Sequence, residues 1–304
     1  MTTLLMHKNT TRGGYRDPSI DVFKGIAIIL VVYGHTWPFC REFIYLFHMA
    51  VFMMASGYCY RANIQKLSDW KTYVVKKIRG LYIPFVICNG CFTLLSGFFL
   101  HVGLYTNAPE FLIQTDGWPL TQTLYQYTGA ADIGKQLIKV LLFIGTTQFG
   151  TATWFLTSLF VVLAVHSCIE LLLYKMRESY KLIAFGVILF IVLILAQVIS
   201  DIKPSLIFVI KCFPCTYAAF LMGWFIRKIK WKNMYSYWMG LISLATLIFL
   251  SKFFSIEVSA GKIQNIIVFI ISSLCGWIFL KSLSELVVRT GKLGFAFQYI
   301  GRHT

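Results

Sequence analysis

Long apolar runs alternate along the chain with short polar or basic segments. Eight of these runs are long enough to cross a bilayer, at roughly 22 to 39, 43 to 60, 81 to 103, 151 to 173, 182 to 200, 205 to 226, 234 to 253 and 264 to 282. The pattern predicts an all-α protein, a polytopic bundle of transmembrane helices that forms a single membrane-embedded domain over residues 1–304.

Composition agrees with a membrane location. Of the 304 residues, 58% are apolar and only 13% charged, which excludes a disordered chain and makes a soluble enzyme a poor interpretation. Lys and Arg number 28 against 12 Asp and Glu, so the formal net charge is +16. On so apolar a chain, a basic excess indicates orientation in a membrane rather than a nucleic-acid partner.

The basic residues gather in alternate connecting segments. If the N-terminus is cytoplasmic, 20 of the 28 lie inside, in segments 1 to 20, 61 to 80, 174 to 181, 227 to 233 and 283 onward, with Lys281. This is the positive-inside pattern, and it predicts a multi-pass protein of the cell membrane with a cytoplasmic N-terminus. For most of these clusters the simplest interpretation is that they fix topology and meet anionic lipid headgroups.

The first predicted helix carries three ionisable residues, Asp21, Lys24 and His35. Such groups are costly inside a bilayer, so each is a functional candidate. Eleven steps of helix rotate by about 1,100°, close to three full turns, so Lys24 and His35 share a face about 16 Å apart along the axis. Asp21 lies one turn before Lys24, where an ion pair can form. A helix-start pair with a snorkelling Lys24 explains those two residues equally well.

The second predicted helix runs back inward and brings His48 to a depth similar to that of His35. A neutral histidine can take a proton from a hydroxyl while a second polar group orients it, so the two could form a general base and its helper. The alternative is a pair of histidines satisfied by hydrogen bonds between helices. We favour that alternative for His48 and catalysis for His35.

Other polar or small residues in the spans have simpler interpretations. Ser56 and Gly57 are typical of close helix packing. Trp154 starts the fourth run, where an interfacial anchor is expected more than a stacking partner for a substrate. His101 and His166 have no charged neighbour in register, and we expect no role for them.

No metal site is expected. The chain contains two C-x-x-C pairs, Cys88 with Cys91 and Cys212 with Cys215, but no histidine or carboxylate cluster lies beside either in the sequence.

The string from Ile20 to His35, IDVFKGIAIILVVYGH, resembles the first helix of integral-membrane acyltransferase family 3, and more narrowly its fucose 4-O-acetylase-like sugar acetyltransferase branch. The resemblance covers nearly the whole chain. Phe47 to Phe52 with Ser56-Gly57-Tyr58 is similar to the family's second-helix motif. The family's basic entry to the third helix and its W-F-L motif are matched by Lys76, Lys77, Arg79, Pro84 and Trp154-Phe155-Leu156.

The resemblance implies transfer of an acyl group, usually acetyl, from cytoplasmic acetyl-CoA to a hydroxyl of a lipid-linked or surface glycan. The family's essential histidine falls on His35, and its basic residue, commonly Arg, is Lys24 here. Lys76, Lys77 and Arg79, with Ser56, are then expected near the donor, and Trp154 near the acceptor. We expect the external segment 104 to 150 to determine which acceptor is chosen. It contains an apolar piece at 137 to 144 that is too short to span the membrane and could be re-entrant or interfacial.

Three alternatives stay open at the level of sequence. His35 acts either as a general base in direct transfer or as a transiently acetylated relay. A non-enzymatic carrier or flippase for lipid-linked glycans would place the same polar stripe along a substrate path. Residues Tyr299 to Thr304 resemble the opening of the family's final helix, which makes an inactive truncated enzyme the third possibility.

Overall fold

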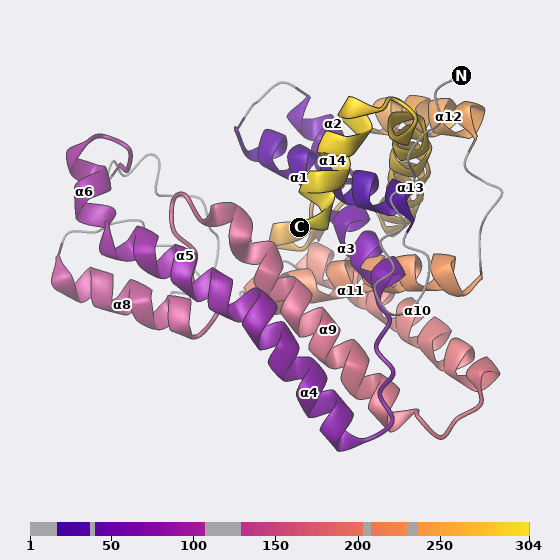
Figure 1. Cartoon of the computed structure of the whole chain (residues 1–304), viewed down its shortest axis with the longest axis horizontal. Helices are drawn as coiled ribbons and strands as arrows, with labels where there is room; N and C mark the ends of the chain where they lie inside the picture. Colours follow the sequence, from indigo (N-terminus) through magenta and orange to yellow (C-terminus); the bar gives the residue numbers. More distant parts are fainter. Residues whose placement is uncertain (1–16, 37–39, 107–128, 203–207, 230–235, 304) are drawn as a thin grey trace.

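The computed structural model describes residues 17–36, 40–106, 129–202, 208–229 and 236–303, which are mainly helical (Figure 1). In chain order the elements are α1 (Pro18–Thr36), α2 (Arg41–Tyr45), α3 (His48–Cys59), α4 (Leu67–Lys77), the π-helical η1 (Ile78–Tyr82), α5 (Ile83–Leu94), α6 (Ser96–His101), α8 (Ala130–Leu141), η2 (Thr151–Thr153), α9 (Trp154–Leu172), α10 (Glu178–Ile202), α11 (Phe208–Lys228), α12 (Tyr237–Leu250), β1 (Ile256–Glu257), η3 (Val258–Ala260), β2 (Lys262–Ile263), α13 (Ile266–Val288) and α14 (Lys292–Arg302).

Within this described part, five helical stretches are long and apolar enough to cross a membrane: Arg41–Cys59, Thr151–Leu172, Glu178–Ile202, Val209–Lys228 and Ile266–Val288. The all-α membrane fold is therefore supported, while the count of eight spans stays a prediction. The run at 234 to 253 forms the shorter α12, and the run at 81 to 103 is divided among η1, α5 and α6. Residues 37–39, 205–207 and 234–235 of the predicted spans lie outside the described residues.

Helices α3 and α11 form the centre of the molecule and contact each other more extensively than any other pair. Their backbones touch because both helices have glycine at the crossing. A Cβ on Gly57 would lie 2.0 Å from the carbonyl oxygen of Phe220, and one on Gly223 would lie 1.9 Å from that of Met54. The sequence-based interpretation of Gly57 as a packing residue is confirmed.

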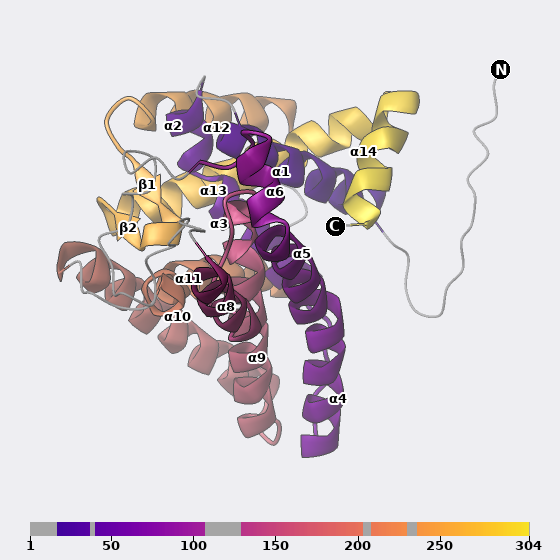
Figure 2. The same cartoon turned by 90° about the vertical axis from the view of Figure 1, so that its left-hand side faces the viewer.

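The remaining helices lie on two sides of this pair. On one side α1 packs against α3, α13 and α14, and α12 packs against α13. On the other, α9 and α10 pack against α11, and α4 runs beside α9 in both views (Figures 1 and 2). The two-residue strands β1 and β2 form a small antiparallel hairpin that contacts α10 and, through η3, α11.

The ends of the central helices gather in two groups. At one end, the starts of α3 and α9 lie together with the hairpin, since His48, Trp154 and Val258 line one small pocket. At the other end, Tyr60 directly follows α3, and its hydroxyl donates a hydrogen bond to Glu170 near the end of α9. Arg227, near the end of α11, donates one to the carbonyl oxygen of Tyr60. We call these the hairpin end and the basic end of the molecule.

The segment that leads into α9 is anchored on α5. The amide of Asn89, fully buried in α5, accepts hydrogen bonds from the backbone N–H and the hydroxyl of Thr147, both at 3.2 Å, and donates one to the hydroxyl of Thr153. A buried amide can satisfy non-helical backbone in this way. Helix α8 ends at Leu141 and packs against α5, so the expected apolar piece at 137 to 144 is the end of α8 and the turn that follows it.

Candidate functional site

The charged residues of α1 face α14. Asp21 is only 3% exposed, and its Oδ2 lies 3.5 Å from Nε of Arg302, near the end of α14. Half-buried Lys24 donates a hydrogen bond from Nζ to the carbonyl oxygen of Gly301 at 2.8 Å. Both groups therefore have partners on the last described helix. The expected ion pair between Asp21 and Lys24 stays a prediction.

Glycine brings α1 and α14 close enough for these contacts. A Cβ on Gly301 would lie 1.8 Å from the carbonyl oxygen of Asp21, and one on Gly25 would lie 2.2 Å from that of Phe297. The ammonium of Lys24 thus reaches the carbonyl end of α14, where the helix dipole favours a cation.

His35 belongs to the last turn of α1, but its side chain lies outside the described residues. Its role as general base or acetyl relay stays a prediction.

His48 is held by its own chain at the start of α3. Its side chain is only 2% exposed, and Nδ1 lies 2.8 Å from the carbonyl oxygen of Ile44, four residues earlier. Because a carbonyl can only accept, the Nδ1 atom of the neutral ring must carry the proton, which makes Nε2 the accepting nitrogen. This bond runs to α2, the short helix directly before α3. The expected hydrogen bonds between membrane-spanning helices stay a prediction.

The His48 ring lies where three parts of the chain meet. The ring centroid of Tyr45 is 4.9 Å away, and a pocket of about 10 Å³ is lined by Tyr45, His48, Met49, Trp154, Val258 and Ser259. Trp154 is only 8% exposed, so its indole packs in the protein beside this pocket. The structure thus brings together His48 and Trp154, two of the residues that the sequence indicated.

The predicted donor-binding residues lie where α4 passes into η1. Lys76 and Arg79 are exposed, whereas Lys77 is half-buried with Nζ 5.3 Å from the ring centroid of Tyr73. Burial lowers the pKa of the Lys77 ammonium, and the neighbouring charge of Lys76 lowers it further. These three cations belong to α4 and η1, which both pack against α9, and not to the contact between α1 and α14.

Ser56 lies in α3 directly before the glycine crossing. Its hydroxyl donates a hydrogen bond to the carbonyl oxygen of Phe52 at 3.2 Å, which is the usual bond of a serine to its own helix. Its expected contact with the donor stays a prediction.

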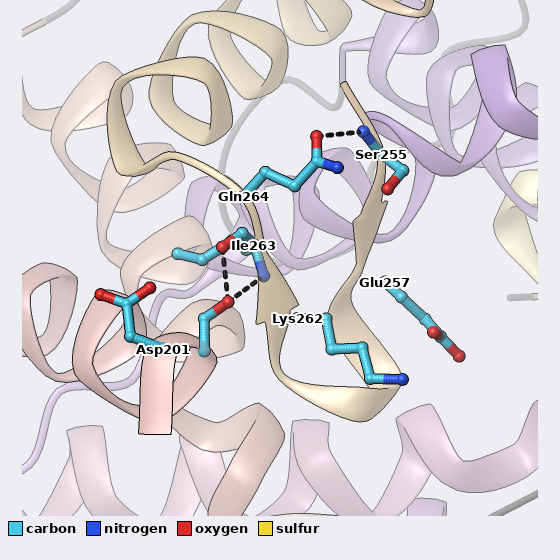
Figure 3. A pocket seen from close by; sticks show the side chains of 7 residues that line it. Asp201, Ser255, Glu257, Lys262, Ile263 and Gln264 are labelled. Carbon is cyan, nitrogen blue, oxygen red and sulfur yellow. Dashed lines mark hydrogen bonds between the residues drawn. The ribbon is translucent and has the colours of Figure 1, made fainter. Parts of the chain in front are cut away.

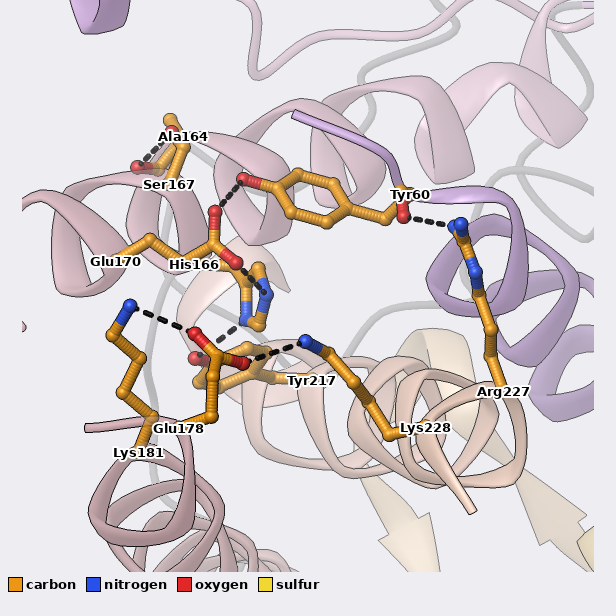
Figure 4. A network of polar contacts seen from close by, with 10 residues as sticks. All are labelled: Tyr60, Ala164, His166, Ser167, Glu170, Glu178, Lys181, Tyr217, Arg227 and Lys228. Atoms are coloured by element: carbon orange, nitrogen blue, oxygen red, sulfur yellow. Dashed lines mark hydrogen bonds and ion pairs between the residues drawn. The ribbon is translucent and has the colours of Figure 1, made fainter. Parts of the chain in front are cut away.

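A buried polar cluster at the basic end escaped sequence analysis (Figure 4). His166 is fully buried in α9, and its Nε2 lies 3.9 Å from a carboxylate oxygen of Glu170. The other oxygen of Glu170 accepts a hydrogen bond from the Tyr60 hydroxyl at 2.8 Å, and the Tyr217 hydroxyl lies 3.4 Å from Nδ1 of His166. The expectation that His166 has no charged neighbour is wrong, because Glu170 lies four residues on, one turn along the same face.

Ion pairs and backbone contacts extend this cluster. Arg227 donates to the carbonyl oxygen of Tyr60 at 2.5 Å, and so fixes the chain that leaves α3. At the start of α10, Glu178 accepts from Lys181 at 3.0 Å and from Lys228 at 3.1 Å. Several of the basic residues that set the predicted topology therefore also join helix ends (Figure 4).

Among the residues that the structure describes, no group of three or more His, Cys, Asp or Glu side chains is placed to hold a metal ion. Cys212 and Cys215 are buried in α11, and Cys88 and Cys91 are exposed on α5.

The fold and the charged groups buried in it define a polytopic membrane protein with ionisable residues at its helix contacts. The family model described as the acyltransferase domain, that of acyltransferase family 3, matches residues 17–304, and the chain belongs to this family. No curated protein matches the chain. No solved structure matches it either.

Proposed function

We propose that this membrane acyltransferase is an O-acetyltransferase that moves an acetyl group from cytoplasmic acetyl-CoA to a sugar hydroxyl of a lipid-linked or surface glycan. The main support for the proposal is the position of the charged residues on α1, in a chain that belongs to this family. Asp21 and Lys24 lie inside the helix contact, and His35 follows about three turns later on the same face.

The basic end is the cytoplasmic end in this proposal, because the positive-inside pattern places the N-terminus there. The phosphates of the donor meet Lys76, Lys77 and Arg79, and Lys24 adds a positive charge further along the path of the acyl arm. Ser56, on α3, lies beside that path.

The hairpin end then faces outward and receives the acceptor. Trp154 and His48 line a pocket there, and both lie on helices that start at this end. His48, with its proton held on Nδ1 by Ile44, presents Nε2 as an acceptor that orients the reacting groups.

In direct transfer, a nitrogen of His35 takes the proton of the sugar hydroxyl while the oxygen attacks the thioester carbonyl. The tetrahedral intermediate collapses, the carbon–sulfur bond breaks, and the coenzyme A thiolate leaves with the proton that the imidazolium returns. In the relay, His35 itself attacks the thioester, and the carbon–sulfur bond breaks to release the thiolate. The sugar oxygen then attacks the acetyl-imidazole, the carbon–nitrogen bond breaks, and the hydroxyl proton passes by way of the freed imidazole to the thiolate.

The deciding experiment measures transfer of label from radiolabelled acetyl-CoA to glycan in membranes that carry the wild type, His35→Ala or empty vector. We expect label with the wild type and none above vector with His35→Ala, at equal protein levels in the membrane. His101→Ala is the matched control, since His101 is exposed at the end of α6, and it should transfer at the wild-type rate. Wild-type transfer by His35→Ala would remove that residue from the mechanism.

The carrier interpretation makes the opposite prediction in the same membranes. A carrier moves lipid-linked glycan across the membrane without a thioester donor. If glycan translocation continues when acetyl-CoA is withheld, and no label appears on glycan, the protein is a carrier and not an acetyltransferase.

A further inference from the structure

The hairpin between α12 and α13 forms one wall of a polar cleft that is separate from the pocket of His48 and Trp154 (Figure 3). The cleft has a volume of about 440 Å³ and is lined by Ser200, Asp201, Ser255, Glu257, Lys262, Ile263 and Gln264. Asp201 and Ser200 come from the end of α10, and the other residues come from the two strands and the residues beside them.

The frame of this hairpin cleft is held by hydrogen bonds. The hydroxyl of Ser200 bonds to both the N–H and the carbonyl of Ile263, which fastens α10 to β2, and Gln264 accepts from the N–H of Ser255 across the hairpin (Figure 3). Gly261, at φ 64°, closes the turn against α11, where a Cβ would lie 2.6 Å from the carbonyl oxygen of Lys211. The cleft is therefore preformed and does not depend on a ligand for its shape.

The polar groups on this frame suit a hydroxyl-rich ring. The carboxylates of Asp201 and Glu257 accept hydrogen bonds from hydroxyl groups, while the Lys262 ammonium and the Gln264 amide donate them. Two carboxylates against one ammonium disfavour an anion.

The position of the hairpin ties this cleft to the candidate site. Glu257 and Lys262 are paired across the two strands, and the turn between them carries Val258 and Ser259 into the pocket of His48 and Trp154. One short element thus contributes to both places. A glycan held in the cleft would extend along the hairpin towards His48.

We propose that the hairpin cleft binds a sugar ring of the glycan acceptor, with Asp201 and Glu257 as the main hydrogen-bonding groups. This inference rests on the proposed function, because it assumes a glycan that approaches from the hairpin end. It assigns acceptor recognition to residues 200–201 and 255–264, beyond the segment 104 to 150 in which the sequence led us to expect it.

Binding can be tested without catalysis. The probe is a panel of methyl glycosides of hexoses, 6-deoxyhexoses and N-acetylhexosamines at millimolar concentration, observed by saturation-transfer difference NMR with the full chain in detergent. The variant is Asp201→Asn with Glu257→Gln, and the matched control is Glu42→Gln, an exposed carboxylate of α2 outside the cleft. We expect a signal from at least one glycoside with the wild type and the control, and its loss with the double variant. No signal with the wild type, or an equal signal with the double variant, would overturn the cleft.

Transfer kinetics separate this proposal from the proposed function. With the glycoside that binds as acceptor, the double variant should raise the KM for acceptor about tenfold, while the KM for acetyl-CoA stays at the wild-type value. An unchanged acceptor KM would refute the cleft and leave the acetyltransferase intact. Binding that the double variant abolishes, in a wild type that transfers no acetyl group, would support the cleft and refute the acetyltransferase. Gel filtration of both variants checks that the fold is retained.

Discussion

Lys24 in the first helix donates a hydrogen bond to the carbonyl oxygen of Gly301 in the last described helix, 277 residues later, at a distance of 2.8 Å. Beside this bond, Asp21 pairs with Arg302. The two charged residues at the start of the polar stripe are thus held by α14, whose position decides where the Lys24 ammonium lies. Contact between α1 and α14 becomes a condition for activity in the proposed mechanism.

Replacing Gly301 with Ala should separate these helices. The added Cβ would lie 1.8 Å from the carbonyl oxygen of Asp21, so α14 must move and the bond to Lys24 must lengthen. We expect a destabilisation of about 1–3 kcal/mol and a loss of most acetyl transfer. Thermal unfolding in detergent and transfer assays in membranes measure the two effects. Gly186→Ala in α10, where a Cβ meets nothing within 4 Å, is the control and should leave both values unchanged.

Substitutions of Lys24 test which property of its side chain matters. The ammonium donates a hydrogen bond to the carbonyl oxygen of Gly301, and a point charge is sufficient for that contact, which does not require the bidentate fork of Arg. Lys24→Arg should therefore keep more than about a tenth of the wild-type kcat, whereas Lys24→Gln should lose at least about a hundredfold. Equal losses in both variants would mean that side-chain shape, and not charge, is required at this position.

Contacts between residues close together in the sequence could be predicted, whereas contacts between distant residues could not. A hydrogen-bonded His48 was expected, but through bonds between membrane helices, and the bond that the structure describes runs to residue 44, one turn away. Gly57 likewise indicated a close crossing, because small residues in membrane helices are typical of one. The partners of Asp21 and Lys24 lie on α14, and no local pattern connects residues so far apart.

The cluster around His166 was missed for two different reasons. Its link to Glu170 follows from a spacing of four residues and was open to sequence analysis. Its links to Tyr60 and Tyr217 arise only when α3, α9 and α11 pack together. The hairpin cleft is of the second kind, because strands of two residues are too short to produce an alternating pattern.

The titration of Lys77 predicts the pH dependence of donor binding. Burial lowers the pKa of this ammonium below the ordinary 10.5, and the phosphates of the donor bind the protonated form. Donor affinity should therefore fall as the pH rises through the lowered pKa, before an ordinary lysine would lose its charge. Binding of a thioether analogue of acetyl-CoA, measured between neutral pH and 10.5, reports the change.

Two Lys→Arg variants on α4 distinguish an effect of Lys77 itself from a general effect of the positive charge on this helix. Lys77→Arg should bind the analogue with an alkaline limit moved to higher pH, since a guanidinium does not titrate in this range. Lys71→Arg, an exposed position of α4, should keep the wild-type profile. If Lys77→Arg also keeps the wild-type profile, Lys77 does not contact the donor phosphates.

The hydrogen bond from Tyr60 to Glu170 should contribute mainly to stability. It joins the chain after α3 to α9 at 2.8 Å, and loss of the hydroxyl would leave a carboxylate oxygen of Glu170 without that donor among aromatic rings. We expect Tyr60→Phe to destabilise the protein by about 1–3 kcal/mol. Thermal unfolding in detergent measures this, with Tyr180→Phe, at an exposed ring of α10, as the neutral control. Because the proposed mechanism gives no residue of the cluster a role in acyl transfer, kcat in the folded fraction should stay within about twofold of wild type. A large fall in kcat at unchanged stability would instead place Glu170 in the transfer chemistry.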